Sequence, residues 1–138
     1  MTTHQSARSW ALRGRGDEGS AVVDFVLVSV LVTAMFLGVI QVAIVLHVRS
    51  TLIDSAAEGA RVAGRADRGL ADGEARTVAL AGAALGERYT HDVSATYEVA
   101  ADVRTVRMSV SAPLPVIGFW GPAGVLTVDG HALVEELP

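Results

Sequence analysis

The sequence predicts an α+β protein with a long amino-terminal transmembrane helix, a second helix and a small three-stranded antiparallel sheet. Three observations predict this class. An uncharged apolar run extends from Val26 to Val48, helical spacings follow as far as about Leu85, and apolar residues then alternate with polar ones. The roughly ninety residues after Val48 are enough for one small core but not for two domains. We therefore expect a leader (1–19), a stem helix (20–48) and a carboxyl-terminal α+β domain (49–138).

The apolar run is long enough to cross a membrane. It contains no Asp, Glu, Lys or Arg, and a helix of this length spans roughly 35 Å, against about 30 Å for a hydrocarbon core. From Phe25 to Val48, sixteen Val, Leu, Ile and Phe residues favour insertion by about 5 to 10 kcal/mol. Asp24 lies near the edge of the run, where a carboxylate costs less than the roughly 2.5 to 3.5 kcal/mol of a mid-bilayer charge. Insertion is therefore favoured.

A buried helix of a soluble core and an ordinary secretory signal peptide are the alternatives to a membrane stem. The run is longer than a chain of this size normally buries. It also exceeds the 7 to 15 apolar residues of a signal peptide, and Arg49 follows it without an Ala-x-Ala cleavage site. An uncleaved signal anchor stays open as an alternative.

The helix is expected to continue from Arg49 to about Gly64. Glu58 and Arg61 are three residues apart and can form a surface ion pair. Small and apolar residues at helical spacing form a stripe that allows close packing against the sheet or a neighbouring stem: Leu52, Ala56, Ala60 and Ala63.

A second helix is predicted after the glycines that follow residue 63. Asp72 is expected as its N-cap, with Glu74 in the first turn and an end near Gly86. Its expected buried stripe consists of Val78, Ala81 and Leu85.

Strands are predicted where the apolar period changes to two. The first two, around 93–99 and 106–112, are joined at Ala100–Asp102 and are expected to form an antiparallel hairpin. The segment from Pro113 to Gly124 is rich in proline and glycine and is predicted to be an irregular loop. Asp129-Gly130 is a common two-residue turn, but alternation continues without a break from 126 to 134. We therefore predict one long third strand.

The junction between leader and apolar run has an unusual residue order. Gly19 and the small residue Ser20 precede Asp24 and Phe25, so a lone carboxylate begins a membrane segment. Glycine lets an extended backbone approach a protease cleft closely. Cleavage after Gly19 would give Ser20 a mostly protonated amine, with a pKa of about 7.7 to 8.

This junction resembles the processing site of type IV prepilins, with the cut between Gly19 and Ser20. The family's usual Glu five positions after the cut is replaced by Asp24, which is one methylene shorter. Ala56 to Arg61, which includes Glu58, Gly59, Ala60 and Arg61, is similar to a segment of TadE-like proteins, the minor pilins of tight-adherence pilus systems. Ser111–Pro115 and the strand after it are also similar to that family.

The resemblance implies a structural role and a set of partners. It implies processing by a prepilin peptidase, assembly by a pilus ATPase with its membrane platform, and association with major and minor pilins. The leader would be cytoplasmic and the domain from residue 49 onward an extracytoplasmic, pilin-like head, in the inner membrane or the pilus. Asp24 and the new amine would set the register between neighbouring stems.

Enzymatic and nucleic-acid functions have little support in the sequence. The chain has no cysteine, its four histidines lack metal-ligand spacing, and no phosphate loop or catalytic motif occurs. We expect no catalytic, cofactor or metal site. Without residues 1–19 the chain has eight Arg against thirteen acidic residues, a net charge of −5 that disfavours nucleic acid. A membrane-anchored protein whose outer domain binds a ligand or envelope component stays open as an alternative function.

Overall fold

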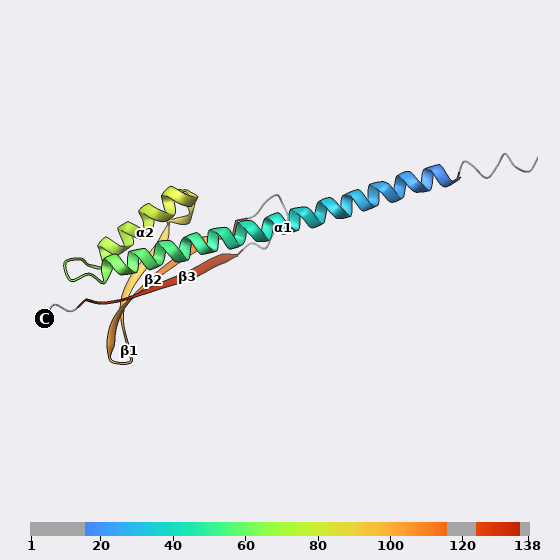
Figure 1. Ribbon diagram of the computed structural model, residues 1–138. Helices are drawn as coiled ribbons and strands as arrows, with labels where there is room; N and C mark the ends of the chain where they lie inside the picture. The colour runs from blue at the N-terminus through green and yellow to red at the C-terminus, as the bar shows by residue number, and fades with distance from the viewer. Residues whose placement is uncertain (1–15, 116–123, 136–138) are drawn as a thin grey trace, which may run out of the picture. The chain divides into compact units, whose positions relative to one another are not determined.

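The computed structural model describes residues 16–115 and 124–135. Figure 1 shows the order of elements: α1 (Gly16–Ala63), α2 (Leu70–Leu85), a 3₁₀ turn (Glu87–Tyr89), β1 (Asp92–Ala100), β2 (Val103–Pro113) and β3 (Val125–Leu133). The predicted α+β class and its two helices and three antiparallel strands are confirmed. Most of the loop predicted between Pro113 and Gly124 lies outside the described residues.

The chain forms two compact units, which are described separately. The first ends at Ile40 and contains the amino-terminal part of α1, which we call the stem segment (residues 19–40). The second, the head unit, begins at Gln41 and contains the rest of α1, together with α2 and the sheet. Helix α1 therefore belongs to both units.

The buried stripe predicted on α1 is confirmed. It packs in the core of the head unit with Val48, and every member is at most 4% exposed: Val48, Leu52, Ala56, Ala60 and Ala63. Because three of the five residues are alanine, the helix backbone can lie close to its neighbours in that part of α1.

Helix α2 differs from the prediction at its start and in its buried face. Its N-cap is Gly69, and Asp72 is the third helical residue, whose Oδ2 accepts a hydrogen bond from the Gly69 N–H at 3.0 Å. Asp72 therefore still satisfies a free donor of the first turn, from inside the helix. The helix ends at Leu85, with Gly86 as C-cap, as predicted.

The predicted buried stripe of α2 is wrong at two of three positions. Ala81 is buried, but Val78 is 38% exposed and Leu85 is only partly buried. The helix instead buries Gly73, Thr77 and Ala81. An apolar pattern could not identify this face, because close helix packing selects a glycine and a hydrogen-bonded threonine in place of large apolar residues.

The sheet has the order β1-β2-β3, with antiparallel pairing throughout. The predicted β1–β2 hairpin is confirmed. Its two-residue turn is Ala101–Asp102, both with positive φ (52° and 65°), as the right-handed twist of a tight hairpin requires. Pairing of Ala100 with Val103 closes the turn.

The prediction of a single third strand is also confirmed, and Gly130 explains why no turn forms there. Gly130 is buried in β3 opposite Met108 of β2. A Cβ on Gly130 would lie only 2.5 Å from the carbonyl carbon of Ala56 and 2.8 Å from its oxygen. The glycine therefore serves the close approach of β3 to α1, in place of a turn.

The core of the head unit lies between the helices and one face of the sheet. Val106, Met108 and Val110 of the central strand are fully buried, and Val128 of β3 is 4% exposed. The edge of β1 is closed by α2, since Glu74 Oε1 accepts a hydrogen bond from the Ala95 N–H at 2.8 Å. A free edge amide is thereby satisfied.

Candidate assembly site

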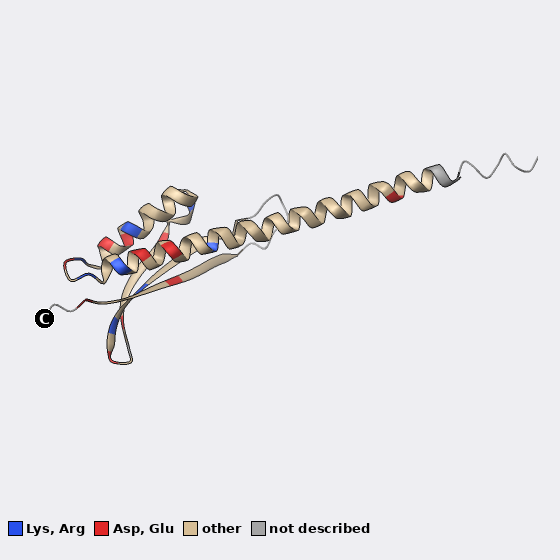
Figure 2. Cartoon of the chain, viewed as in Figure 1, with Lys and Arg blue, Asp and Glu red and all other residues tan. Residues whose placement is uncertain are grey.

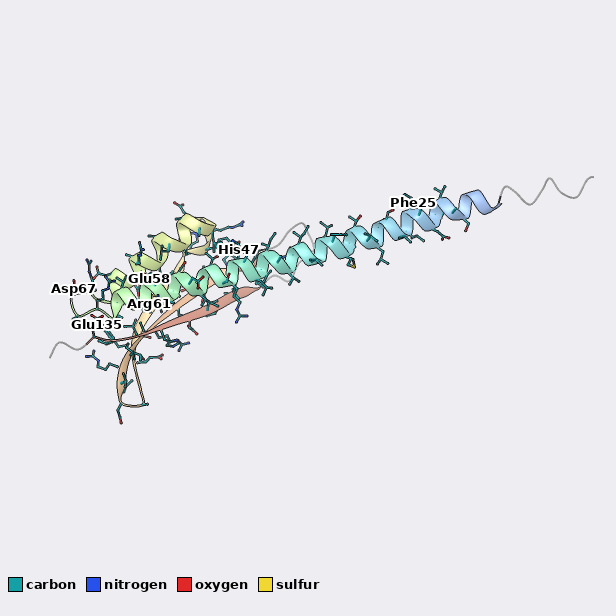
Figure 3. All side chains as sticks on the ribbon, viewed as in Figure 1. Phe25, His47, Glu58, Arg61, Asp67 and Glu135 are labelled. Atoms are coloured by element: carbon teal, nitrogen blue, oxygen red, sulfur yellow. The ribbon has the colours of Figure 1, made fainter. Side chains whose placement is uncertain are left out.

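The stem segment is an apolar helix whose surface is not covered by any other part of the chain that the structure describes. None of its most apolar 18-residue stretch is buried by the described residues. Phe25 is 73% exposed, and its side chain projects freely from α1 (Figure 3). By length and composition, α1 from Gly19 onward is the one described helix that could cross a membrane. It is consistent with a membrane anchor or a signal sequence.

Two hydroxyl groups of the stem segment, those of Ser29 and Thr33, form hydrogen bonds within the helix. Ser29 Oγ donates to the Phe25 carbonyl and Thr33 Oγ1 to the Ser29 carbonyl, both at 2.7 Å. These bonds within the helix make the hydroxyls compatible with lipid. Asp24 is exposed and has no hydrogen bond or ion pair with any other residue that the structure describes.

Charge is distributed unevenly along the molecule. Figure 2 shows that Arg, Asp and Glu gather in the head unit, while the described part of α1 before it is almost entirely uncharged. Asp24 is therefore an isolated carboxylate on an apolar surface. Such a group is unfavourable in lipid unless a cation joins it.

Gly19 and Ser20 lie in the opening turns of α1 and are exposed. Among the described residues, no atom outside its own helical turn lies within 4 Å of the position that a Cβ on Gly19 would occupy. Helix α1 begins at Gly16, on the leader side of the expected cut. The first four N–H groups of a helix lack intrahelical partners, so opening this end to an extended form costs little.

The segment Glu58–Arg61 divides into a surface pair and a packing pair. Arg61 Nη1 and Glu58 Oε2 are 3.6 Å apart, which confirms the predicted ion pair on the exposed side of α1 (Figure 3). Gly59 and Ala60 are buried. This separation shows that the motif places two charges in solvent and two small residues at a helix contact.

Gly59 is the point where α1 meets α2. A Cβ on Gly59 would collide with Thr77 Oγ1 and lie 2.7 Å from the Gly73 carbonyl oxygen. A Cβ on Gly73 would in turn lie 2.5 Å from the Gly59 carbonyl oxygen and 2.6 Å from Ala63 Cβ. Thr77 Oγ1 donates to the Gly73 carbonyl at 3.0 Å, which satisfies a fully buried hydroxyl. The two glycines therefore form a backbone-to-backbone helix contact.

The outer face of the sheet carries a charge cluster that sequence reasoning missed. Arg107 of β2 donates to Glu98 of β1 at 3.2 Å and to Asp129 of β3 at 3.0 Å. The hydrogen bond from Arg107, followed by one from Ser109, holds the pKa of Asp129 below its usual value. The same two carboxylates raise the pKa of Arg107. The sequence shows that these three residues occupy polar positions of the strands. Only the strand register shows that they are neighbours on the sheet.

The described residues contain no group of three or more His, Cys, Asp or Glu side chains arranged to hold a metal ion. The residues predicted from sequence fall into two regions: the stem segment and the helix contact around Gly59. They lie on the same helix but do not come together as one cluster, since Asp24 belongs to the stem segment and Glu58 to the head unit.

Comparison with known proteins gives one match. The family described as TadE-like protein matches residues 19–61, from the expected cleavage residue to the last residue of the Glu-Gly-Ala-Arg segment. Ser111–Pro115 lies outside the matched residues, so that part of the predicted resemblance stays a prediction. No curated protein and no solved structure matches the chain. The match covers 43 of the chain's 138 residues, and over that part the chain is similar to TadE-like proteins.

Proposed function

We propose that this protein is a structural minor pilin or pseudopilin, that it is not an enzyme, and that a prepilin peptidase cleaves it between Gly19 and Ser20. The observation that carries the proposal is Asp24, an exposed carboxylate without a partner on an uncovered apolar helix. The match to TadE-like proteins begins at residue 19, which is the proposed cleavage residue. Residues 1–19 are the leader in this proposal.

Cleavage supplies the missing partner of Asp24. The new amine of Ser20 has a pKa of about 7.7 to 8 and is mostly protonated at neutral pH. Four residues of helix separate Ser20 from Asp24, so the amine of one stem and the carboxylate of a neighbour can meet when the stems are staggered. A buried charge whose partner is removed costs about 3 to 5 kcal/mol. Other staggers are therefore disfavoured, and the pair determines the register of the filament.

The stem segment has two environments in this proposal. Before assembly it lies in the inner membrane, with the leader in the cytoplasm and the head unit outside. During assembly it leaves lipid for the apolar stems of major and minor pilins, with little net change in apolar exposure. The pilus ATPase and its membrane platform supply the work of extraction. The shorter Asp24, in place of Glu, requires a closer approach of the neighbouring amine.

Variants at residues 19 and 24, expressed with the peptidase and the pilus machinery, test the two steps separately. Gly19→Ala is expected to accumulate as the uncleaved chain, because the added methyl group obstructs entry of the backbone into the protease. Asp24→Asn is expected to reach the membrane but to enter pili at a level reduced about tenfold or more. Asp24→Glu restores the family's usual residue and is expected to be incorporated normally.

Asp54→Asn is the matched control, since it makes the same change at an exposed carboxylate of α1 outside the stem segment. It is expected to behave as the parent in both steps. Immunoblots of membrane and sheared-pilus fractions measure maturation and incorporation. Normal incorporation of Asp24→Asn would refute the register role, and normal maturation of Gly19→Ala would refute the cleavage site.

A further inference from the structure

The last two turns of the apolar run belong to the head unit and are covered by it on one side. Gln41 Nε2 donates to the Pro115 carbonyl at 2.6 Å, which ties α1 to the end of β2. Ile44 packs against the core, and Val48 is a core residue, 4% exposed. Residues 41–48 therefore cannot be surrounded by lipid on all sides, as a simple stem would be.

The uncovered part of the run alone is long enough to span the hydrocarbon core. Residues 20–40 rise about 31 Å as a helix, against a core thickness of about 30 Å. The headgroup layer on each side adds about 5 to 8 Å, which corresponds to about four or five further helical residues. If the leader end of the helix lies at one surface, residues 41–45 lie in the opposite headgroup layer.

The parts of the head unit beside Gln41 have the composition of a lipid-contacting surface. Leu114 donates its N–H to the Gly124 carbonyl at 3.0 Å, so the end of β2 and the start of β3 meet at this level. Val125 is 71% exposed, and Val42 and Leu46 of α1 are 58% and 60% exposed. No Asp, Glu, Lys or Arg occurs in residues 41–48, 112–115 or 124–128.

We propose that this surface, the membrane-proximal base (Gln41, Val42, Leu46, Leu114 and Val125), lies in the headgroup layer and contacts lipid. The membrane boundary then falls at Gln41 and not at Val48, about six turns before α1 ends at Ala63. The occupant is lipid because Gln41 directly follows the stem segment in α1, because Val42, Leu46 and Val125 are exposed, and because these segments contain no charged residue. The head unit is consequently held against the bilayer, without a free helical stalk between them. This inference rests on the proposed membrane insertion of the stem segment.

Fluorescent labels on single cysteines test the proposal, because the chain has no cysteine of its own. Full-length Val125→Cys, Leu31→Cys and Asp67→Cys are each labelled with a nitrobenzoxadiazole dye and reconstituted in phosphatidylethanolamine–phosphatidylglycerol vesicles. Leu31 marks the middle of the stem segment. Asp67 follows the end of α1 at Ala63, which lies about 33 Å along the helix from Gln41. Quenching by iodide in the water and by doxyl groups on the lipids is measured for each.

The proposal expects the Val125 label to be quenched by lipid doxyl groups near the headgroup and to be several-fold less accessible to iodide than the Asp67 label. Lipid quenching of the Val125 label equal to that of the Asp67 label, with the Leu31 label in lipid, would overturn the inference and leave the proposed function intact. Protection from iodide without lipid quenching would also overturn it, in favour of contact with another protein copy. A Leu31 label in water would overturn both proposals.

Discussion

At the residue scale, three glycines allow close packing because they have no side chain. Gly59 and Gly73 bring α1 and α2 into backbone contact, while Gly130 brings β3 against α1. Gly82, on the same helix as Gly73, has only an ordinary contact, since its Cβ would lie 3.6 Å from Thr90 Cγ2. The surroundings of each glycine therefore determine the effect of adding a methyl group.

Gly73→Ala is expected to lower the free energy of unfolding by about 1 to 3 kcal/mol, because the added methyl group overlaps the Gly59 carbonyl and Ala63. Gly82→Ala is the matched control and is expected to raise it by up to about 1 kcal/mol, since alanine is the better helix former. Thermal unfolding of the full chain in detergent micelles, followed by circular dichroism, measures both. A Gly73→Ala variant as stable as Gly82→Ala would show that the helices are not in contact there.

The lowered pKa of Asp129 makes a prediction about pH. A carboxyl whose pKa is lower in the folded state stabilises the fold above its unfolded pKa of about 4. That contribution is lost as the pH falls through the lowered pKa of Asp129. We therefore expect the parent to be more stable than Asp129→Asn at pH 7, and the difference to disappear in acid.

Arg107→Gln is the companion variant, because it removes the first cause of the pKa shift. It is expected to abolish the same pH-dependent part of the free energy of unfolding. The double variant should therefore lose no more of this pH-dependent stability than either single variant. Urea unfolding between pH 2 and pH 7 provides the measurement. A constant difference between parent and Asp129→Asn over this range would contradict the assignment.

At the scale of elements, strand β3 shows how one residue can decide between two structures. Asp129-Gly130 fits a hairpin turn, yet β3 continues as a single strand because both residues have partners. Asp129 contacts Arg107 on the outer face, and Gly130 lies under α1 on the inner face. The alternation of apolar residues therefore predicted the single strand correctly, whereas the Asp-Gly pair alone would have predicted a turn.

Gly130→Val is expected to lower the free energy of unfolding by at least about 1 to 3 kcal/mol, because the obstructing atoms belong to the backbone of Ala56 and Ala57 and cannot rotate away. His131→Val, at the exposed neighbouring position, is the control and is expected to change stability by about 0.5 kcal/mol or less. Chemical unfolding of the full chain in micelles compares them. Equal stability of the two variants would argue against the close β3–α1 contact.

The elements could be predicted from sequence where a regular period identified a buried face. The stripe from Leu52 to Ala63 and the order of strands were predictable, because apolar spacing reflects burial directly. The buried face of α2 was not, since Gly73 and Thr77 are selected by the shape of the α1 contact and not by hydrophobicity. The Arg107 cluster and the Gln41–Pro115 hydrogen bond join residues far apart in sequence, so only the folded register reveals them.

At the scale of the whole molecule, the chain consists of an apolar stem segment and a folded head unit. The head unit has its own core and a charge cluster on the outer face of its sheet. The stem segment has no partner within the described chain and contains one unpaired carboxylate. Its stability in any environment depends on what surrounds it, which is lipid before assembly and other stems afterwards in the proposed function.

The most direct test of this account is the amino-terminal residue of the protein recovered from membranes of cells that contain the peptidase. Sequencing together with intact mass measurement identifies that residue. The account predicts Ser20, with the residue-1 end found in cells without the peptidase. Recovery of the full-length chain from peptidase-containing cells would contradict the account, because Asp24 would then face its neighbours without the amine that pairs with it.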